Sequence, residues 1–157
     1  MNDMLFQITN PGVEEKAIQL LEDQFHFQMP WDMKSFYLKQ NGAILSSGIK
    51  IDPEGCSLSF FHPIDRQYQK HVLTINKLLD WQNMDGFIPM CYIPFCSDEA
   101  GDSYYIRVAK EGYGKVYYIF SEFLDEFLED PDGNGYIAGS FTEFLEKLRL
   151  FLEEFTE

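Results

Sequence analysis

The segment that most resembles a ligand-binding site is Asp130-Pro131-Asp132-Gly133-Asn134-Gly135. Its oxygen-bearing side chains stand at alternate positions before a glycine, as in the first half of a calcium-binding loop. Such a loop is closed by a bidentate glutamate six residues after its glycine, here Gly135, but this sequence has Phe141 at that position. We therefore expect a solvated turn here, with a cation site at Asp130–Asn134 as the alternative.

Cysteine and histidine side chains are the next candidates for chemistry. They are Cys56, Cys91, Cys96, His26, His62 and His71. Their positions include no C-x-x-C or H-x-x-x-H spacing, which would favour zinc. A nucleophilic Cys96 needs a lowered thiol pKa, whereas the nearby carboxylates of Asp98, Glu99 and Asp102 should raise it. We expect no catalytic residue, metal or cofactor. An enzyme or metal protein is the alternative, either through converging histidines and cysteines or through paired carboxylates of the glycosidase type.

The charge of the chain indicates the class of partner. The chain has 26 Asp and Glu and 12 Lys and Arg, which gives a net charge of -14. Residues 121–157 alone contain 11 acidic and two basic residues. This charge repels nucleic acid and anionic lipid and favours a basic partner. No apolar run resembles a signal peptide or approaches the ~20 residues of a membrane span. We therefore expect a cytoplasmic protein that binds neither nucleic acid nor membrane.

The loop Asp98-Glu99-Ala100-Gly101-Asp102 has two compatible interpretations. It can be a tight connection into a strand, in which Gly101 adopts a positive φ and Asp102 bonds to nearby backbone. It can also be an exposed acidic rim that contacts a basic partner.

Two segments rich in strand-forming residues, Ser103–Val108 and Lys115–Phe120, flank a glycine-containing turn. This pattern predicts a β-hairpin. Because side chains alternate along a strand, Tyr104 and Ile106 should face one side of the sheet and Tyr105 the other. Bulky side chains on both faces predict a central, covered hairpin.

Apolar periodicity predicts several helices around this hairpin. They begin at Asn10-Pro11, cover Trp31–Gln40, Val72–Gln82 and Glu122–Glu129, and begin again at Ser140. Asn10 is predicted to cap the first helix before Pro11, and Ser140 with Glu143 forms a capping box for the last. Short strands are expected between Ala43 and Pro63. No linker divides the chain, so we expect a single domain over residues 1–157.

Four segments, in order, resemble motifs of the SMI1/KNR4 family, the core of the SUKH superfamily. Pro30–Gly42 resembles its second helix, Ile93–Tyr105 its "I-P-F-A-x-D-x-x-G-D-x-[YF]" signature, Gly114–Tyr118 its "G-x-V-Y" strand and Ser140–Leu145 its terminal "S-F-x-E-F-L" helix. Cys96 stands where members often have a small residue. No histidine follows the "V-Y" strand, so no role of that histidine is carried over.

The resemblance implies an α+β fold, in which N-terminal and C-terminal helices flank an antiparallel sheet. For bacterial members it implies an immunity protein that neutralises a polymorphic toxin, often a nuclease, by binding it without catalysis. Fungal relatives imply the alternative, a regulatory interaction module with a non-toxin partner. We expect a monomer that contacts a basic toxin through acidic side chains and one aromatic anchor. The expected contact residues are Asp98, Glu99, Asp102, Tyr113, Glu122, Asp125, Glu126 and Glu129.

Overall fold

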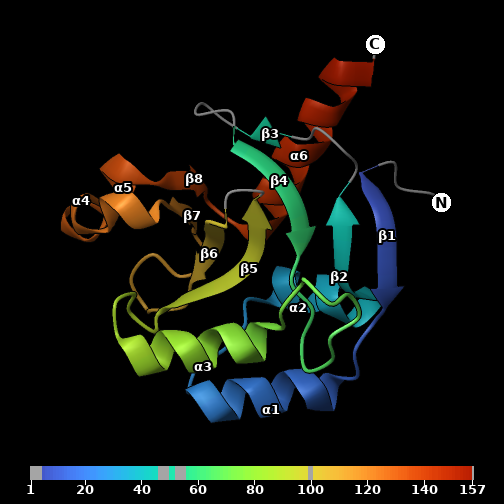
Figure 1. The fold of residues 1–157 in the computed structure, drawn as a ribbon, viewed down its shortest axis with the longest axis horizontal. Helices are drawn as coiled ribbons and strands as arrows, with labels where there is room; N and C mark the ends of the chain where they lie inside the picture. Colours follow the sequence, from blue (N-terminus) through green and yellow to red (C-terminus); the bar gives the residue numbers. More distant parts are fainter. Residues whose placement is uncertain (1–4, 46–49, 52–55, 99–100, 157) are drawn as a thin grey trace.

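The computed structural model describes residues 5–45, 50–51, 56–98 and 101–156, with side chains for residues 5–45, 59–98 and 101–150 (Figure 1). The strands are β1 (Phe6–Pro11), β2 (Gln40–Leu45), β3 (Lys50–Ile51), β4 (Cys56–Phe61), β5 (Tyr92–Asp98), β6 (Ser103–Arg107), β7 (Val116–Ile119) and β8 (Tyr136–Ala138). The helices are α1 (Glu15–Phe25), α2 (Trp31–Lys39), α3 (Ile75–Asp85), η1 (Ser121–Phe123, a 3-10 turn), α4 (Leu124–Glu129), α5 (Pro131–Asn134) and α6 (Phe141–Thr156).

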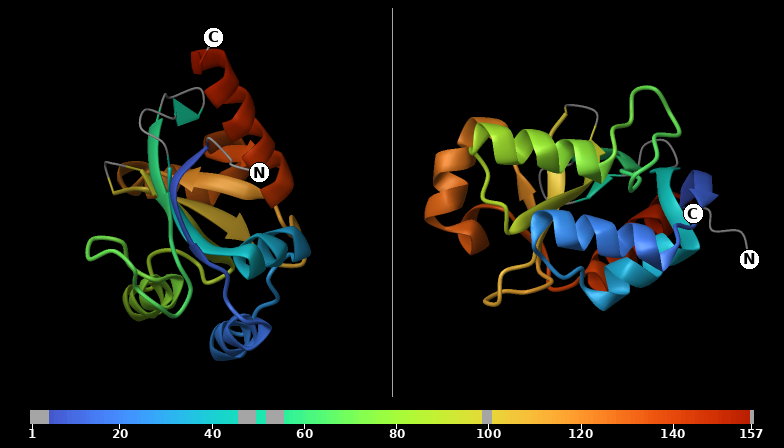
Figure 2. Two further views of the ribbon diagram at one scale, coloured as in Figure 1. Left: turned by 90° about the vertical axis from the view of Figure 1, so that its right-hand side faces the viewer. Right: turned by 90° about the horizontal axis from the view of Figure 1, so that it is seen from below.

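The strands form one curved antiparallel sheet. Its order is β1-β2-β4-β5-β6-β7-β8, and β3 pairs with β4 at one end. Helices α1 and α3 lie below the ends of the strands, α6 stands behind the sheet, and α4 with α5 project at the β7–β8 side (Figures 1 and 2). The predicted α+β architecture, with helices from both ends of the chain against an antiparallel sheet, is confirmed.

The predicted hairpin is formed by β6 and β7. Tyr104 pairs with Tyr118 and Tyr105 with Tyr117. Tyr104 and Ile106 enter the main core, whereas Tyr105 and Tyr117 face the opposite side of the sheet in a second apolar cluster. Because β5 and β8 pair with the outer sides of the hairpin, it is central, as its bulky alternating side chains predict.

The main core lies between the sheet and helices α1, α2, α3 and α6, and its centre is aromatic. Phe61 of β4 lies 5.1 Å from the ring of Phe36 in α2 and 6.1 Å from that of Phe144 in α6, measured between ring centroids. Rings at these separations attract each other beyond the effect of burial alone. The second cluster covers the other face near β5–β7 and consists of Tyr92, Tyr105, Tyr117, Ile119 and Phe127.

The predicted starts of helices α2 and α6 are confirmed, and α6 also has its predicted side-chain cap. Helix α2 begins directly after Pro30 and buries Met33, Phe36 and Tyr37. At the start of α6, the Ser140 hydroxyl accepts the Glu143 N–H (3.0 Å). The Glu143 carboxylate accepts the Gly139 N–H (2.9 Å), whereas in a standard capping box it would accept the N–H of the N-cap residue itself, Ser140. No helix in the described part of the chain is long and apolar enough to cross a membrane.

The predicted helix start at Asn10-Pro11 is wrong, because both residues lie in β1. Pro11 pairs with Gln40 of β2, and the Asn10 side-chain amide donates to the Asn41 carbonyl (3.0 Å). Helix α1 begins instead at Glu15. Proline is tolerated on this edge strand, so strand pairing overrides the local capping signal.

The predicted start of the third helix at Val72 is also wrong. Helix α3 begins at Ile75, after Thr74, whose hydroxyl accepts the Lys77 N–H (3.1 Å). Val72 is buried in the preceding loop. Its apolar side chain extended the helical pattern toward the N-terminus, although the capping threonine sets the boundary.

Gly12 lies against the backbone of α2, where there is no room for a side chain. A Cβ atom at this position would lie 1.9 Å from the Leu38 carbonyl oxygen of α2. We therefore expect Gly12→Ala to lower the free energy of unfolding by about 1–3 kcal/mol, measured by urea denaturation. Gly139→Ala is the matched control, because its added Cβ would meet only the flexible ends of Glu143 and Tyr136. Equal stability of the two variants would contradict this prediction.

Candidate protein-binding site

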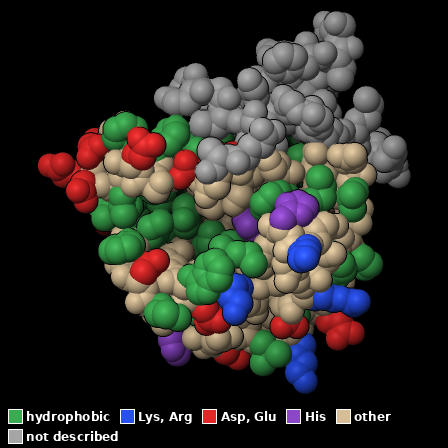
Figure 3. Space-filling view, viewed as in Figure 1, with side chains coloured by type: hydrophobic (Ala, Val, Ile, Leu, Met, Phe, Trp, Pro, Cys, Tyr) green, Lys and Arg blue, Asp and Glu red, His purple; other side chains and the backbone are tan. Residues whose placement is uncertain are grey.

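Helices α4 and α5, with the preceding turn η1, carry a dense group of exposed carboxylates, which we call the acidic surface. It consists of Glu122, Asp125, Glu126, Glu129, Asp130 and Asp132. The carboxylates gather at one end of the molecule (Figure 3). No Lys or Arg occurs in the sequence between Lys115 and Lys147. Among the described residues, only Asp132 of this set forms an ion pair, with Lys115 at 3.9 Å. The surface therefore offers nearly unneutralised negative charge to a basic group.

The acidic surface contains four of the predicted contact residues, Glu122, Asp125, Glu126 and Glu129, all of them exposed. Asp130 and Asp132 enlarge it. The sequence interpretation treated these two residues only as parts of a turn or a cation loop. The absence of any basic residue from 116 to 146 is the signal that could have joined them to the same surface.

Phe127 fixes α4 on the sheet. Its ring is 1% exposed and lies 5.3 Å from the Tyr92 ring and 5.6 Å from the Tyr117 ring. Close packing also requires Gly135, since a Cβ atom there would lie 2.5 Å from the Tyr118 carbonyl oxygen and 2.9 Å from the Phe127 ring. The exposed carboxylates of α4 are thus carried on a helix with a single deep apolar anchor.

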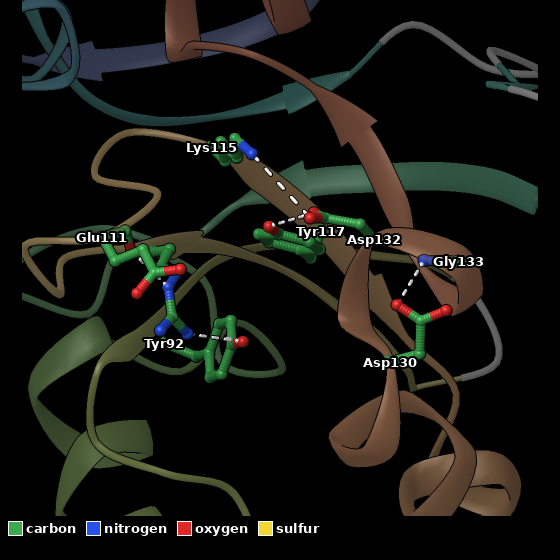
Figure 4. A network of polar contacts seen from close by, with 8 residues as sticks. Tyr92, Glu111, Lys115, Tyr117, Asp130, Asp132 and Gly133 are labelled. Atoms are coloured by element: carbon green, nitrogen blue, oxygen red, sulfur yellow. Dashed lines mark hydrogen bonds and ion pairs between the residues drawn. The ribbon is translucent and has the colours of Figure 1, made fainter.

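A polar network holds α5 against the hairpin (Figure 4). The Tyr117 hydroxyl donates to Asp132 Oδ1 (2.7 Å), and the Lys115 ammonium pairs with the other oxygen of that carboxylate. Burial and then the hydrogen bond to Asp132 raise the pKa of Tyr117 well above its ordinary value, so the phenol remains a donor at neutral pH. Beside this network, Arg107 donates to the Tyr92 hydroxyl (2.6 Å).

The segment that resembles half of a calcium loop folds as the short helix α5. Asp130 is its N-cap and accepts the Gly133 N–H (3.3 Å). The Asn134 side chain donates to the carbonyl oxygens of Glu126 (2.8 Å) and Asp130 (3.0 Å). These side chains bond to local backbone rather than converge on a common point. Among the described residues, no group of three or more His, Cys, Asp and Glu side chains could hold a metal ion.

The prediction that Asp98 belongs to an exposed rim is wrong. Asp98 is buried, and its two oxygens accept the Tyr118 hydroxyl (2.5 Å) and the Asp102 N–H (3.0 Å). Gly101 adopts the predicted positive φ, 93°, and Asp102 accepts the Ser121 N–H (3.2 Å) while remaining half-buried. Glu99 lies outside the described residues. The positive φ predicted for Gly101 is therefore confirmed, whereas the Asp102 side chain bonds to the distant backbone of Ser121 rather than to that of its own loop.

Tyr113 lies at the tip of the β6–β7 hairpin, between Gly112 and Gly114, both with positive φ. Its ring is exposed, and its hydroxyl donates to the Gln28 carbonyl in the loop between α1 and α2 (2.8 Å). The ring is therefore fixed in place, and Tyr113 is not one of the residues of the acidic surface. Its role as an aromatic anchor stays a prediction.

Among the cysteines and histidines with described side chains, Cys96 and His62 are buried, whereas His26 and His71 are exposed. Burial and then the charge of Asp98 raise the pKa of the Cys96 thiol, as the neighbouring carboxylates predict. His62 Nδ1 lies 2.7 Å from the Leu73 carbonyl, so this nitrogen must carry a proton and Nε2 accepts the Ser97 hydroxyl (2.5 Å). Both His62 and Ser97 are buried, so this pair joins β5 to the residue that follows β4 rather than facing a substrate.

Comparison with known protein families agrees with this fold and these motifs. The family model described as SMI1 / KNR4 family (SUKH-1) matches residues 12–147. The chain belongs to the SMI1/KNR4 family. The matched region of this SMI1/KNR4 chain begins just after β1, ends within α6, and includes the whole acidic surface.

Sequence reasoning missed a second feature of this SMI1/KNR4 fold, a groove between α3 and α4. We call it the α3–α4 groove, and its volume is about 310 Å³. Its lining includes two carboxylates, Asp85 and Asp102, and the hydrophobic residues Leu78, Trp81, Phe87, Ile88, Tyr105 and Leu124. Hydrophobic side chains gather on this part of the surface, next to the carboxylates of α4 and α5 (Figure 3). Trp81 lies outside the apolar stripe of α3. A large aromatic residue at such a position is the sequence signal that could have indicated the groove.

Proposed function

We propose that this SMI1/KNR4 protein is an immunity protein. It acts in the cytoplasm by binding a cognate protein toxin, without catalysing a reaction and without a cofactor. The observation that supports this proposal is the acidic surface, which presents exposed carboxylates on a firmly anchored helix pair. The toxin is expected to be basic and of the nuclease type.

The charge of the acidic surface explains how binding would inhibit such a toxin. A nuclease must attract a polyanion, so its active-site cleft is basic. An inhibitor with concentrated negative charge is steered toward that cleft and competes with nucleic acid for it. Association should therefore slow as salt is added, since ions screen charges separated by more than ~10 Å at 0.1 M.

The anchoring of the acidic surface favours tight binding once the partners meet. Binding costs about 0.5–1.5 kcal/mol for each mobile side chain that becomes ordered at an interface. Phe127 in the second cluster and the Tyr117–Asp132 hydrogen bond hold α4 and α5 before any partner arrives. The helix pair itself then needs little ordering on binding.

Neutralising the acidic surface is expected to slow toxin association at least tenfold at low salt, because electrostatic steering is lost. The variant carries Glu122→Gln, Asp125→Asn, Glu126→Gln and Glu129→Gln. The measurement is the association rate with the toxin domain encoded beside this gene, by surface plasmon resonance, together with protection of cells that co-express it.

The matched control removes the same number of exposed charges elsewhere. It carries Glu14→Gln, Glu15→Gln, Asp23→Asn and Asp80→Asn, all at exposed positions outside the acidic surface. If both variants slow association equally, total charge rather than this surface drives binding. If the wild-type protein binds no neighbouring toxin, a regulatory module with a non-toxin partner becomes the better assignment.

A further inference from the structure

The α3–α4 groove joins an apolar floor to exposed aromatic walls. Tyr105 and Ile119, from the second cluster, form its floor, and Leu124 of α4 forms one side. Trp81 and Phe87 form the side next to α3 and are 48% and 69% exposed. Large aromatic side chains left open to water beside a hollow are typical of surfaces that bind a partner.

Two carboxylates belong to the lining of the groove. Asp85 Oδ1 accepts the Phe87 N–H (2.9 Å) and Asp102 Oδ1 accepts the Ser121 N–H (3.2 Å), so backbone bonds fix both side chains. In the described part of the chain, neither forms an ion pair. No described Lys, Arg or His lines the groove. Both carboxylates lie near enough to add to burial in raising the pKa of Tyr105 to about 12.

We infer that the α3–α4 groove receives an arginine side chain of the protein partner. This inference rests on the proposed function and names one chemical group of that partner. The guanidinium is flat, weakly hydrated and always charged, so it can stack on Trp81 while its N–H groups donate to Asp85 and Asp102. A lysine ammonium is more strongly hydrated and lacks the flat face that would lie along the indole.

The groove and the acidic surface are continuous, which suits a single basic partner. Leu124 lines the groove, and the next residue in α4, Asp125, belongs to the acidic surface. Long-range attraction to the acidic surface would bring the partner close. Burial of one arginine in the groove would then provide a central contact of the kind that contributes most to binding.

The first test uses the folded protein and a peptide probe, acetyl-Gly-Arg-Gly-amide, observed by NMR. We expect this peptide to shift the indole N–H resonance of Trp81 and to leave that of Trp31 unchanged. Trp31 is 71% exposed and lies outside the groove, so it is an internal control. Replacing arginine with citrulline, which keeps the shape without the charge, should weaken binding at least tenfold. A lysine peptide should also bind several-fold more weakly.

The second part of this test removes the carboxylates. Asp85→Asn with Asp102→Asn retains an oxygen acceptor for the Phe87 and Ser121 N–H groups, so folding should persist. We expect at least a tenfold loss of arginine-peptide affinity, whereas Asp80→Asn on the same helix should have no effect. An unshifted Trp81 resonance, or equal shifts with the arginine, lysine and citrulline peptides, would overturn the inference.

A toxin-binding measurement separates this inference from the proposed function. Trp81→Ala should weaken binding of the neighbouring toxin domain at least tenfold, whereas Trp31→Ala should not. If Trp81→Ala binds like wild type while neutralisation of the acidic surface slows association, the groove inference fails and the proposed function stands. If no toxin binds, the proposed function fails, and the peptide titration alone decides whether the groove accepts arginine.

Discussion

Phe127→Ala is expected to lower the free energy of unfolding by about 3–5 kcal/mol, the usual cost of deleting a buried aromatic ring. The Phe127 ring is 1% exposed and packs edge-on against Tyr92 and Tyr117. Its removal leaves a cavity beneath α4 and releases the helix that carries Asp125, Glu126 and Glu129, half of the acidic surface. Urea denaturation measures the stability, and toxin binding should weaken in parallel.

Phe123→Ala is the matched control for this prediction, because it removes the same ring from a neighbouring position that is 55% exposed. Its effect on stability should stay within about 0.5 kcal/mol, as is usual for surface substitutions. Equal losses in the two variants would mean that Phe127 does not anchor α4. Loss of stability without loss of toxin binding would mean that partner binding does not depend on α4.

The stability of the protein is expected to fall between pH 7 and pH 5 through His62. Burial lowers the pKa of His62 from 6.5 to about 4, against an opposing hydrogen bond to the Leu73 carbonyl. Above pH 6.5 the imidazole is neutral in both the folded and the unfolded chain. Below that pH the unfolded chain binds a proton that the folded one excludes, so stability falls until pH 4, by about 3 kcal/mol in total.

The measurement is the difference in the free energy of urea unfolding between pH 7 and pH 5. His62→Gln removes the titration while keeping an amide that can donate to Leu73 and accept from Ser97. The wild-type protein should lose about 2 kcal/mol more than this variant over the two pH units. His71→Gln, at an exposed position, should behave like wild type. Identical pH dependence of wild type and His62→Gln would contradict the prediction.

The parts of the fold that the sequence predicts correctly are those governed by local pattern. The alternation of Tyr104 and Tyr105 places them on opposite faces of the sheet, and Ser140 caps α6. The errors arise where distant residues compete with local signals. Asn10-Pro11 has the composition of a helix start, but pairing with β2, which lies about thirty residues further on, makes it a strand end.

In the candidate site, too, the features set by local sequence are predictable, and those that depend on distant residues are not. Consecutive acidic residues and the lack of a basic neighbour predict the acidic surface, because α4 and α5 are adjacent in the chain. The burial of Asp98 depends on Tyr118, and a local pattern cannot assign that hydroxyl to the carboxylate. The α3–α4 groove is built from α3, β6 and α4, so its lining is recognisable only in three dimensions.

One of the two edge strands of the sheet, β1, has a consequence for how the protein behaves at high concentration. An open strand edge invites a strand from another molecule, which is a common route to aggregation. Here the pairing of β1 with β2 shifts register twice, between Phe6 and Ile8 and between Thr9 and Pro11, and Pro11 lacks an N–H to offer. Such irregularities discourage edge-to-edge stacking. At high concentration, the backbone of β1 as well as the net charge of the chain would thereby oppose aggregation.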